Sequence, residues 1–385
     1  MKIKGVRGEV VKDSRGDDTI KVTILTDVGS FSASAPNGKS KGVHEAKPYA
    51  KSLSKDIESL GKLSEYFSSE YIEKFEDLRR VEDIVGGHVG ANTLFALESA
   101  VLKGLASEKK KEIWELINPD AKKIPRFVGN AVGGGKHSES TKKPDFQEFL
   151  LVPDGGSAKK NFEILSEKKE ALVRLLTERD KKFKKKKNDE NAWMTSLNEK
   201  EVFDVLVSLD VPFGSDIAAS SFYKRKKYHY KNPPLDRTTE EQIGYLKNLL
   251  KNYNLYYVED PFSEGDFESF AELLKFHPNS LIVGDDLTVT NYKRLEKAIE
   301  IKSINAIIVK PNQNGSLLEV ARVVELAKKH DIKTIFSHRS GETKESILAD
   351  LAFGFGADFM KCGITGAERE IKIKRLIEIE KSLKV

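Results

Sequence analysis

Apolar and polar residues follow two different periods in the first third of the chain. From Lys21 to Ala35 they alternate, with Asp27-Val28-Gly29 as a turn between two runs, which predicts a β-hairpin. From about Tyr49 to Leu116 the apolar residues recur at the spacing of one helical face, and strands followed by helices predict a small α+β domain. The clearest helical stripe contains Leu94, Leu97, Ala100, Val101 and Leu105.

A polar link, NPDAKKIP (Asn118–Pro125), separates this region from the rest of the chain. We therefore expect an N-terminal domain over residues 1–122 and a larger domain over residues 123–385. The 261 residues from Pro125 onward are close to the roughly 250 of an eight-stranded β/α barrel.

The larger region repeats one unit, in which a short apolar run meets a charged residue and an amphipathic helical pattern follows. The run LIVGDD (Leu281–Asp286) is the clearest example, and from Glu259 onward the charged positions recur every 23 to 28 residues, the length of one βα unit. Helical stretches start at Thr238 and Ser316, each with a glutamate at capping-box spacing.

The repeat predicts an α/β fold, a (β/α)8 barrel preceded by a smaller α+β domain. In such a barrel the strand ends meet on one face, where active sites lie. The residues expected on that face are Glu148, Asp216, Glu259, Asp285, Lys310, His338, Arg339 and Lys361.

Three of these residues, Asp216, Glu259 and Asp285, are acids at the ends of successive strands. Carboxylates that face one another repel unless a cation lies between them, and oxygen ligands without cysteine favour a hard ion such as Mg²⁺. Each acid taken singly is typical of a solvated strand end, so the prediction of a Mg²⁺ site rests on the three together. Asp286 is interpreted as a turn residue or as a support for Asp285.

Two lysines, Lys310 and Lys361, belong to later strands of the same barrel. A lysine beside a metal ion and a second lysine has its ammonium form disfavoured, so it serves as a base near neutral pH. The alternative is that both lysines only neutralise the acids. His338, Arg339 and Ser340 add a proton carrier and a phosphate-binding fork, which predicts a small substrate with a carboxylate and a phosphate.

Composition limits the remaining classes of function. The net charge of +5 is a weak bias in a chain with 32% charged residues, so nucleic-acid binding is not expected. No apolar run approaches the roughly 18 residues of a membrane span and no leader is evident, so we expect a cytoplasmic protein. The single cysteine, Cys362, excludes an internal disulfide and predicts a packing role. The run Lys181–Lys187 is typical of a solvated loop, or alternatively of a segment that attracts an anionic ligand.

Several stretches resemble the enolase family, the phosphopyruvate hydratases of glycolysis. The resemblance extends over almost the whole chain, and the combination of SHRSGET with GDDLTVTN is highly specific. The matching stretches are DSRGDDTIKV (Asp13–Val22), PNGKSKGVHEA, SDIAAS, VEDPF, GDDLTVTN, IVKPNQNGS, SHRSGET and MKCGITGAERE.

The resemblance implies Mg²⁺-dependent dehydration of 2-phosphoglycerate to phosphoenolpyruvate by a homo-oligomer, at least a dimer. It implies that Lys310 removes the proton next to the substrate carboxylate, and that Glu190, assisted by Glu148, protonates the departing hydroxyl. A Lys or His base that acts together with Mg²⁺ is a known property of the enolase superfamily rather than a deduction from this chain. The other implied roles are Asp216, Glu259 and Asp285 for the first Mg²⁺, Ser40 for the second, Arg339 and Ser340 for the phosphate, Lys361 for the carboxylate, and His137 and His338 as lining residues.

The chain departs from the family pattern around the implied acid. The family segment GDEGG is replaced by Asn188–Ala192, which lacks both glycines, although asparagine accepts the left-handed conformation better than most residues. His137 is followed by Ser-Glu-Ser without a glycine, and Pro311 restricts Lys310 to an extended backbone. Two alternatives stay open: a divergent enolase-superfamily enzyme for another phosphorylated or carboxylated substrate, and a non-catalytic protein that binds nucleic acid or another anion through Lys181–Lys187.

Overall fold

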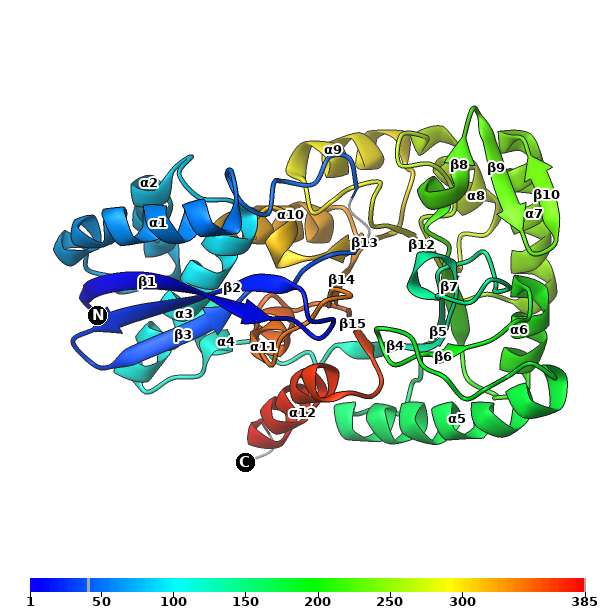
Figure 1. The fold of residues 1–385 in the computed structure, drawn as a ribbon, viewed down its shortest axis with the longest axis horizontal. Coiled ribbons are helices and arrows are strands. Elements are labelled where there is room, and N and C mark those ends of the chain that lie inside the picture. Colours follow the sequence, from blue (N-terminus) through cyan, green and yellow to red (C-terminus); the bar gives the residue numbers. More distant parts are fainter. Residues whose placement is uncertain (40–41, 384–385) are drawn as a thin grey trace.

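The computed structural model describes residues 1–39 and 42–383, so Ser40 lies outside the described residues. A small sheet flanked by helices stands beside a larger barrel, and the C-terminal helix packs on the barrel near their junction (Figure 1). Among the described residues, no helix has the length and apolar character needed to cross a membrane.

The N-terminal part is an antiparallel meander covered by helices. The predicted hairpin is confirmed, because β2 (Asp18–Thr26) pairs with β3 (Ser30–Ser34) with Ile24 opposite Phe31. β1 (Ile3–Lys12) was not predicted, because it is an edge strand whose second half is largely exposed. The helical elements are α1 (Leu53–Leu63), η1 (Ser64–Ser69), η2 (Phe75–Asp77), α2 (Leu78–Val85), α3 (Ala91–Lys109) and α4 (Ile113–Ile117).

The predicted apolar stripe of the 91–117 stretch lies on α3, which covers β2 and β3. Leu97, Ala100, Val101 and Leu105 are fully buried there, and Leu94 is partly buried. The chain then runs without regular structure from the end of α4 to the first barrel strand.

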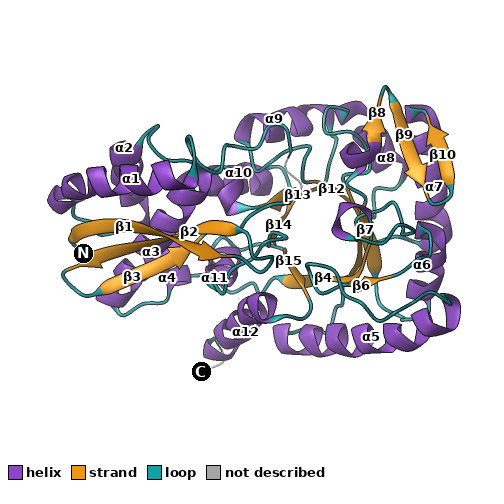
Figure 2. Ribbon diagram, viewed as in Figure 1, coloured by secondary structure: helices purple, strands orange, loops and turns teal. Residues whose placement is uncertain are grey.

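Eight strands close into a barrel because β15 pairs with both β14 and β4. Figure 2 shows the ring of strands with helices around its outside. The barrel strands are β4 (Arg126–Gly133), β5 (Glu148–Leu151), β7 (Phe213–Asp216), β11 (Tyr257–Glu259), β12 (Leu281–Gly284), β13 (Ala306–Val309), β14 (Lys333–Ser337) and β15 (Phe359–Gly363). The helices are α5 (Ala158–Arg179), α6 (Glu199–Val207), α7 (Thr239–Tyr253), α8 (Phe267–Phe276), α9 (Tyr292–Ile301), α10 (Leu317–Lys329), α11 (Ile347–Gly354) and α12 (Ala367–Ser382).

Shorter elements complete this part of the chain. The two-residue strand β6 (Trp193–Met194) extends the barrel sheet beside β4. A separate three-stranded antiparallel sheet follows β7 and consists of β8 (Tyr223–Lys224), β9 (Lys227–Lys231) and β10 (Pro234–Arg237). The 3-10 turns are η3 (Gly135–His137), η4 (Ala219–Phe222) and η5 (Pro311–Gln313).

One strand runs against the predicted repeat. β5 is antiparallel to both of its neighbours, so Glu148 begins its strand instead of ending it, and the expectation of a strand-final Glu148 was wrong. The connection over residues 134–147 is rich in Gly, Ser, Lys and Pro and has no apolar face to form the covering helix that a parallel crossover uses. Reversal of β5 places Glu148 at the same barrel end as the last residues of β7 and β11.

The predicted helix starts are confirmed, with one difference. The Thr238 hydroxyl accepts the N–H of Glu241, whose carboxylate accepts the N–H of Thr238, so the capping box is complete. Ser316 likewise caps the N–H of Glu319, but the Glu319 carboxylate pairs with Arg322 instead of closing the box.

Side-chain alternation explains why polar groups gather inside one end of the barrel. Several apolar residues form a separate buried cluster that is contributed by the barrel strands, among them Leu150, Tyr257, Val283, Ile308 and Phe359. Side chains two positions apart on a strand point to the same face. Each of these apolar residues lies two positions from a candidate site residue, in order Glu148, Glu259, Asp285, Lys310 and Lys361. The charged groups therefore form a layer above an apolar plug.

Candidate active site

Strand register aligns three carboxylates in one row. Glu148 on β5 lies opposite Asp216 on β7, and Asp216 lies opposite Glu259 on β11. The Lys361 ammonium donates to the Glu259 carboxylate at 2.8 and 2.9 Å and to Asp216 at 3.1 Å, and it lies 3.1 Å from a Glu148 oxygen. All four side chains are buried, so Lys361 partly neutralises the row.

The next two strands present a second ion pair, between Asp285 and Lys310. Burial is the largest single influence and lowers the pKa of Lys310, but Asp285 and the other nearby carboxylates, Glu259 among them, together outweigh it, so the net direction is upward. This result is opposite to the expected lowering, because a carboxylate faces the ammonium at close range. Lys310 has an extended backbone before Pro311, as the proline predicts.

The acids at this end of the barrel outnumber the buried bases, and their chemistry fits a hard divalent cation. Burial, followed by the Asp216 charge, raises the pKa of Glu259, which is the direction expected when carboxylates share a site without enough positive charge. Oxygen donors of this kind suit Mg²⁺. The carboxylates of Asp216, Glu259 and Asp285 have the chemistry that suits the predicted ion, but their ligand oxygens do not all lie within 4.8 Å of one another.

Asp260 was not predicted as a site residue, although it is adjacent to Glu259 in the VEDPF stretch. Its carboxylate accepts the backbone N–H groups of Asp285 at 3.0 Å and Asp286 at 2.6 Å, and so it fixes the chain where Asp285 leaves β12. Ligand oxygens of Asp260, Asp285 and Asp286 lie within 4.8 Å of one another. The sequence offered a signal for Asp260, because two adjacent acids follow a buried strand, but only the first of them, Glu259, was assigned a role.

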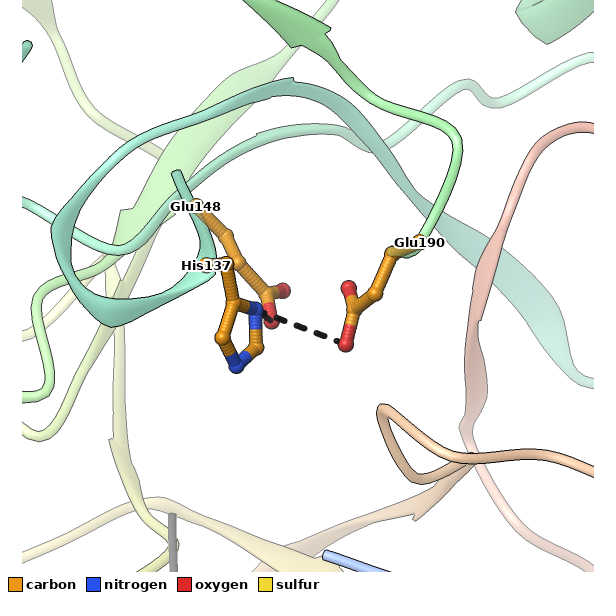
Figure 3. Close-up of side chains that lie close together, drawn as sticks. All are labelled: His137, Glu148 and Glu190. Atoms are coloured by element: carbon orange, nitrogen blue, oxygen red, sulfur yellow. Dashed lines mark ion pairs between the residues drawn. The ribbon is translucent and has the colours of Figure 1, made fainter. Parts of the chain in front are cut away.

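Two loops bring an imidazole between two carboxyl groups. The Nδ1 atom of His137 lies 3.5 Å from an oxygen of Glu148 and 3.5 Å from an oxygen of Glu190. Figure 3 shows Glu190 facing His137 and Glu148 from a separate segment of the chain. The Nε2 atom of His338 lies 3.7 Å from the other Glu190 oxygen, which also accepts a 2.9 Å hydrogen bond from the Asn130 amide.

Burial disfavours the charged form of all four side chains, those of Glu148, Glu190, His137 and His338. Desolvation raises the pKa of Glu190, and desolvation together with the Glu190 charge raises the pKa of Glu148. Desolvation lowers the pKa of both His137 and His338. The carboxyl groups therefore hold a proton more readily than in water while the imidazoles favour the neutral form, which suits a proton donor near neutral pH.

The segment that carries Glu190 is held by side chains instead of glycines. The side-chain oxygen Oδ1 of Asn188 accepts the N–H groups of Glu190 at 3.0 Å and Ala192 at 2.8 Å. Asn191 has a φ of 63°, the left-handed conformation that the sequence analysis considered tolerable for asparagine. Lys169 of α5, a buried residue, donates to the Asn191 carbonyl at 2.6 Å and to the Thr365 hydroxyl at 2.5 Å.

The remaining predicted residues form a cationic corner. The Arg339 guanidinium donates to the Glu45 carboxylate at 2.6 Å and to the side-chain oxygen Oδ1 of Asn312 at 3.3 Å. The Ser340 hydroxyl accepts the N–H of Lys39 at 2.8 Å. Glu45 was not predicted, because its partner Arg339 is 294 residues away in the chain.

One cavity gathers nearly all of the predicted side chains that the structure describes. Glu259 is the exception, because it lies fully buried beneath Lys361. Gln147 and Ser337 were not predicted. The lining residues are Gly38, His137, Gln147, Glu148, Glu190, Asp216, Asp285, Lys310, Ser337, His338, Arg339, Ser340 and Lys361.

A closed barrel whose strand ends present buried carboxylates and two lysines is typical of barrel enzymes that act on carboxylate substrates. Residues 121–385 match the family model described as "Enolase, C-terminal TIM barrel domain". The chain belongs to the enolase family and is a lyase of the phosphopyruvate hydratase type.

Relatives named enolase align with the chain over nearly their full length. The Methanosphaera stadtmanae enolase is 35% identical over 99% of this chain and 97% of the relative. The Pyrobaculum aerophilum enolase is 35% identical over 95% of this chain and 93% of the relative. The Archaeoglobus fulgidus enolase is 34% identical over 99% of this chain and 97% of the relative.

Proposed function

We propose that the chain dehydrates 2-phosphoglycerate to phosphoenolpyruvate in a Mg²⁺-dependent reaction. The observation that carries the proposal is that Lys310 and the carboxyl pair Glu148 and Glu190 lie on opposite walls of one cavity. β13, which precedes Lys310, and β5, which begins at Glu148, are four strands apart in the ring of eight. An elimination needs a base at one carbon and a proton donor at the neighbouring leaving group, and this arrangement supplies both.

In the proposed reaction Lys310, in the neutral form that is favoured once Mg²⁺ rather than Lys310 pairs with Asp285, accepts the proton from the carbon next to the substrate carboxylate. The electron pair of that C–H bond forms the new double bond as the neighbouring C–O bond breaks, and Glu190 donates a proton so that the hydroxyl leaves as water. His137 lies 3.5 Å from Glu190, and an oxygen of Glu148 lies within 4.8 Å of it, so both would hold the Glu190 proton in place. Bound Mg²⁺, held by Asp216, Glu259 and Asp285, would supply positive charge to the substrate carboxylate.

The cationic corner supports a phosphorylated substrate. The Arg339 guanidinium and the Ser340 hydroxyl both line the cavity and would bind the phosphate, with Glu45 as the carboxylate that the phosphate displaces from Arg339. Lys361 would contact the substrate carboxylate as well as the acid row. A phosphate is a stronger acceptor for a guanidinium than a single carboxylate oxygen, which makes the exchange favourable.

The altered loop around Glu190 bears on the choice between dehydration and a divergent reaction. The absence of the two family glycines favoured a divergent enzyme in the sequence analysis. Glu190 is nevertheless buried at the cavity, within 3.5 Å of His137, and the Asn188 side chain hydrogen-bonds its backbone. This geometry supports elimination over proton exchange alone.

The proposal includes a second Mg²⁺ that binds with the substrate and uses Ser40, and a cytoplasmic homo-oligomer, at least a dimer. The kinship with enolases supports Mg²⁺ and oligomers in general. Mg²⁺ titration with and without substrate tests the second ion, because the substrate should raise the binding stoichiometry from one to two. Sedimentation equilibrium tests the dimer.

The decisive experiment is an assay for phosphoenolpyruvate formation from 2-phosphoglycerate with Mg²⁺, for the wild type and for Lys310→Ala. We expect turnover by the wild type and a loss on the order of 10²- to 10⁴-fold in the variant, the usual contribution of a general base. Lys333→Ala, at the exposed start of β14, is the matched control. Folded, Mg²⁺-loaded wild type without turnover would reject the substrate, and an active Lys310→Ala would reject the base. Exchange of the substrate α-proton without product would support the divergent enzyme instead.

A further inference from the structure

A second cavity lies outside the barrel mouth, between the loop over residues 134–147 and the β8–β9 hairpin. Its volume is about 560 Å³, within the range of small-molecule sites. Figure 1 shows the hairpin projecting at the edge of the barrel. The cavity is lined by Gly135, Lys136, Lys143, Pro144, Asp145, Ser221, Phe222, Tyr223, Lys224, His229 and Lys231.

The lining has four lysines and one acid. Asp145 directs its carboxylate at the backbone, where it accepts the N–H of Lys231 at 3.0 Å and the N–H of Asn232 at 2.9 Å. Within the described ranges, no carboxylate oxygen lies within 4.0 Å of the ammonium of Lys136, Lys143, Lys224 or Lys231. Among the described residues these four ammonium groups therefore have no close ion-pair partner, and Asp145 and Glu139 act on Lys143 only from a longer distance. Lys361 in the acid row, by contrast, has three carboxylate partners.

The hairpin turn continues the positive charge. Its central residues, Arg225 and Lys226, have φ values of 50° and 62°. A two-residue turn with both residues left-handed favours Asn-Gly, because side chains with a Cβ are strained there. Turn geometry therefore does not account for two long cationic side chains, and the exposed Lys227 that follows adds a third.

The lysines of this cavity repel one another, and a bound anion would reduce that repulsion. Burial lowers the pKa of Lys143, and the neighbouring charges of Lys231 and Lys39 lower it further. Lys143 donates to the Ser138 carbonyl, which fixes its ammonium at the cavity and leaves it further protons to donate. A phosphate that contacts several of these ammonium groups would be bound by charge-assisted hydrogen bonds.

Two aromatic rings supply an apolar wall. Phe222 and Tyr223 line the cavity and are only partly buried. The Tyr223 ring lies 4.7 Å from Tyr228 and the Phe222 ring 5.0 Å from Tyr230, centroid to centroid, so buried tyrosines hold both in place. Rings fixed in this way provide a surface on which a planar base can stack.

We propose that this cavity binds a nucleoside polyphosphate, with the phosphates on Lys136, Lys143, Lys224 and Lys231 and the base against Phe222 and Tyr223. The site is separate from the cavity that contains Lys310 and does not depend on the proposed dehydration. It shares with that cavity the loop over residues 134–147, which contributes Lys136 and Lys143 to one and His137 to the other.

The test is calorimetric titration of the full-length protein with ATP, tripolyphosphate and adenosine at fixed, low ionic strength. ATP should bind at least threefold more tightly than tripolyphosphate, and adenosine should bind more weakly than either. The double variant Lys143→Gln/Lys231→Gln should weaken ATP binding about tenfold or more, because each hydrogen bond to a charged phosphate contributes on that scale. A second double variant of exposed lysines, Lys136→Gln/Lys224→Gln, should have the same effect and guards against misfolding of the first.

The matched control is Lys181→Gln/Lys184→Gln, which removes the same charge from the exposed lysine run after α5 and should leave ATP binding unchanged. Arg339→Gln should also bind ATP normally, because it alters only the active-site cavity. An equal loss in the control would overturn the proposal in favour of general attraction to a basic surface, and loss in Arg339→Gln would assign the ligand to the active site. Absence of ATP binding at millimolar concentration, or binding only of long oligonucleotides, would also overturn it. Equal affinity for ATP and tripolyphosphate would overturn the contact with the base.

Discussion

The two halves of the active site are built in different ways. Asp216, Glu259 and Lys361 belong to barrel strands, and backbone pairing fixes their relative positions. His137 ends the 3-10 turn η3 within a long connection and Glu190 lies in a loop, so no ladder of strand hydrogen bonds fixes either residue. The loop half depends on individual side chains such as Asn188 and Lys169. The sequence of a loop can therefore depart from the family pattern, provided that new polar contacts replace the lost ones.

The largest expected effect is in the strand half. Glu259→Gln removes one carboxylate from the row and the principal partner of Lys361. Mg²⁺ affinity and turnover should both fall, turnover on the order of a thousandfold, the scale of lost electrostatic stabilisation in a preorganised site. Turnover at increasing Mg²⁺ concentration measures this effect. Glu268→Gln, exposed on α8, is the control, and an unchanged Mg²⁺ requirement in Glu259→Gln would remove Glu259 from the metal site.

The second-largest effect is expected for Glu190→Gln, which should stop product formation while proton abstraction by Lys310 continues. Product formation should fall by roughly 10²- to 10⁴-fold, because an amide cannot donate the proton that the leaving hydroxyl needs. Exchange of the substrate α-proton with solvent, followed by NMR in deuterium oxide, should persist because Lys310 and the acid row are intact. Glu139→Gln, an exposed change on the neighbouring loop, should affect neither rate. Equal losses of exchange and product would show that the two halves do not act separately.

The same division separates what the sequence predicts from what it does not. The strand half was predictable, since short apolar runs and regular unit lengths place Asp216, Glu259, Asp285 and Lys310 at one barrel end without knowledge of distant contacts. Glu190 was assigned from the family resemblance alone, because a glutamate in a lysine-rich stretch has no periodic signal.

Contacts between distant positions explain the remaining misses. Glu45 and Arg339 meet across 294 positions, and Lys169 reaches Asn191 across 22 positions. The direction of β5 was missed for a related reason, because all four residues of this strand are buried and a fully buried strand has the same pattern in either direction. Neither kind of information is present in the local pattern of apolar and polar residues.

Lys169, which holds the Glu190 loop, should make the unfolding free energy of the protein depend on pH. Burial lowers the pKa of Lys169 to about 7, and the ammonium has uncharged acceptors in Asn191 and Thr365. Between this value and the ordinary lysine value of 10.5 the unfolded chain binds more protons than the folded one, so stability rises with pH across that window. Lys169→Met should remove a dependence of up to about 1.4 kcal/mol per pH unit.

Urea unfolding of the wild type and Lys169→Met at pH 7 and pH 9 measures this contribution. The wild type should gain stability over the variant as the pH rises. Lys168→Met is the matched control, because Lys168 is the preceding residue, is partly exposed and pairs with Glu167. If the difference between wild type and Lys169→Met were the same at both pH values, Lys169 would not titrate on unfolding in this range.

The smallest expected effect concerns the backbone of the loop half, at Asn191. Asn191 has a φ of 63°, so its replacement by alanine should lower the unfolding free energy by about 1 kcal/mol. Glycine adopts this conformation freely, so Asn191→Gly should lie within a few tenths of a kcal/mol of the wild type. Urea unfolding of Asn191→Ala and Asn191→Gly measures the difference, and product formation by Asn191→Gly should stay close to the wild type. If both variants lost the same stability, the asparagine would act through its side chain beside Gly366 rather than through its backbone. The loop would then depend on side-chain contacts at Asn191 as it does at Asn188, and the contrast with the strand half would become sharper.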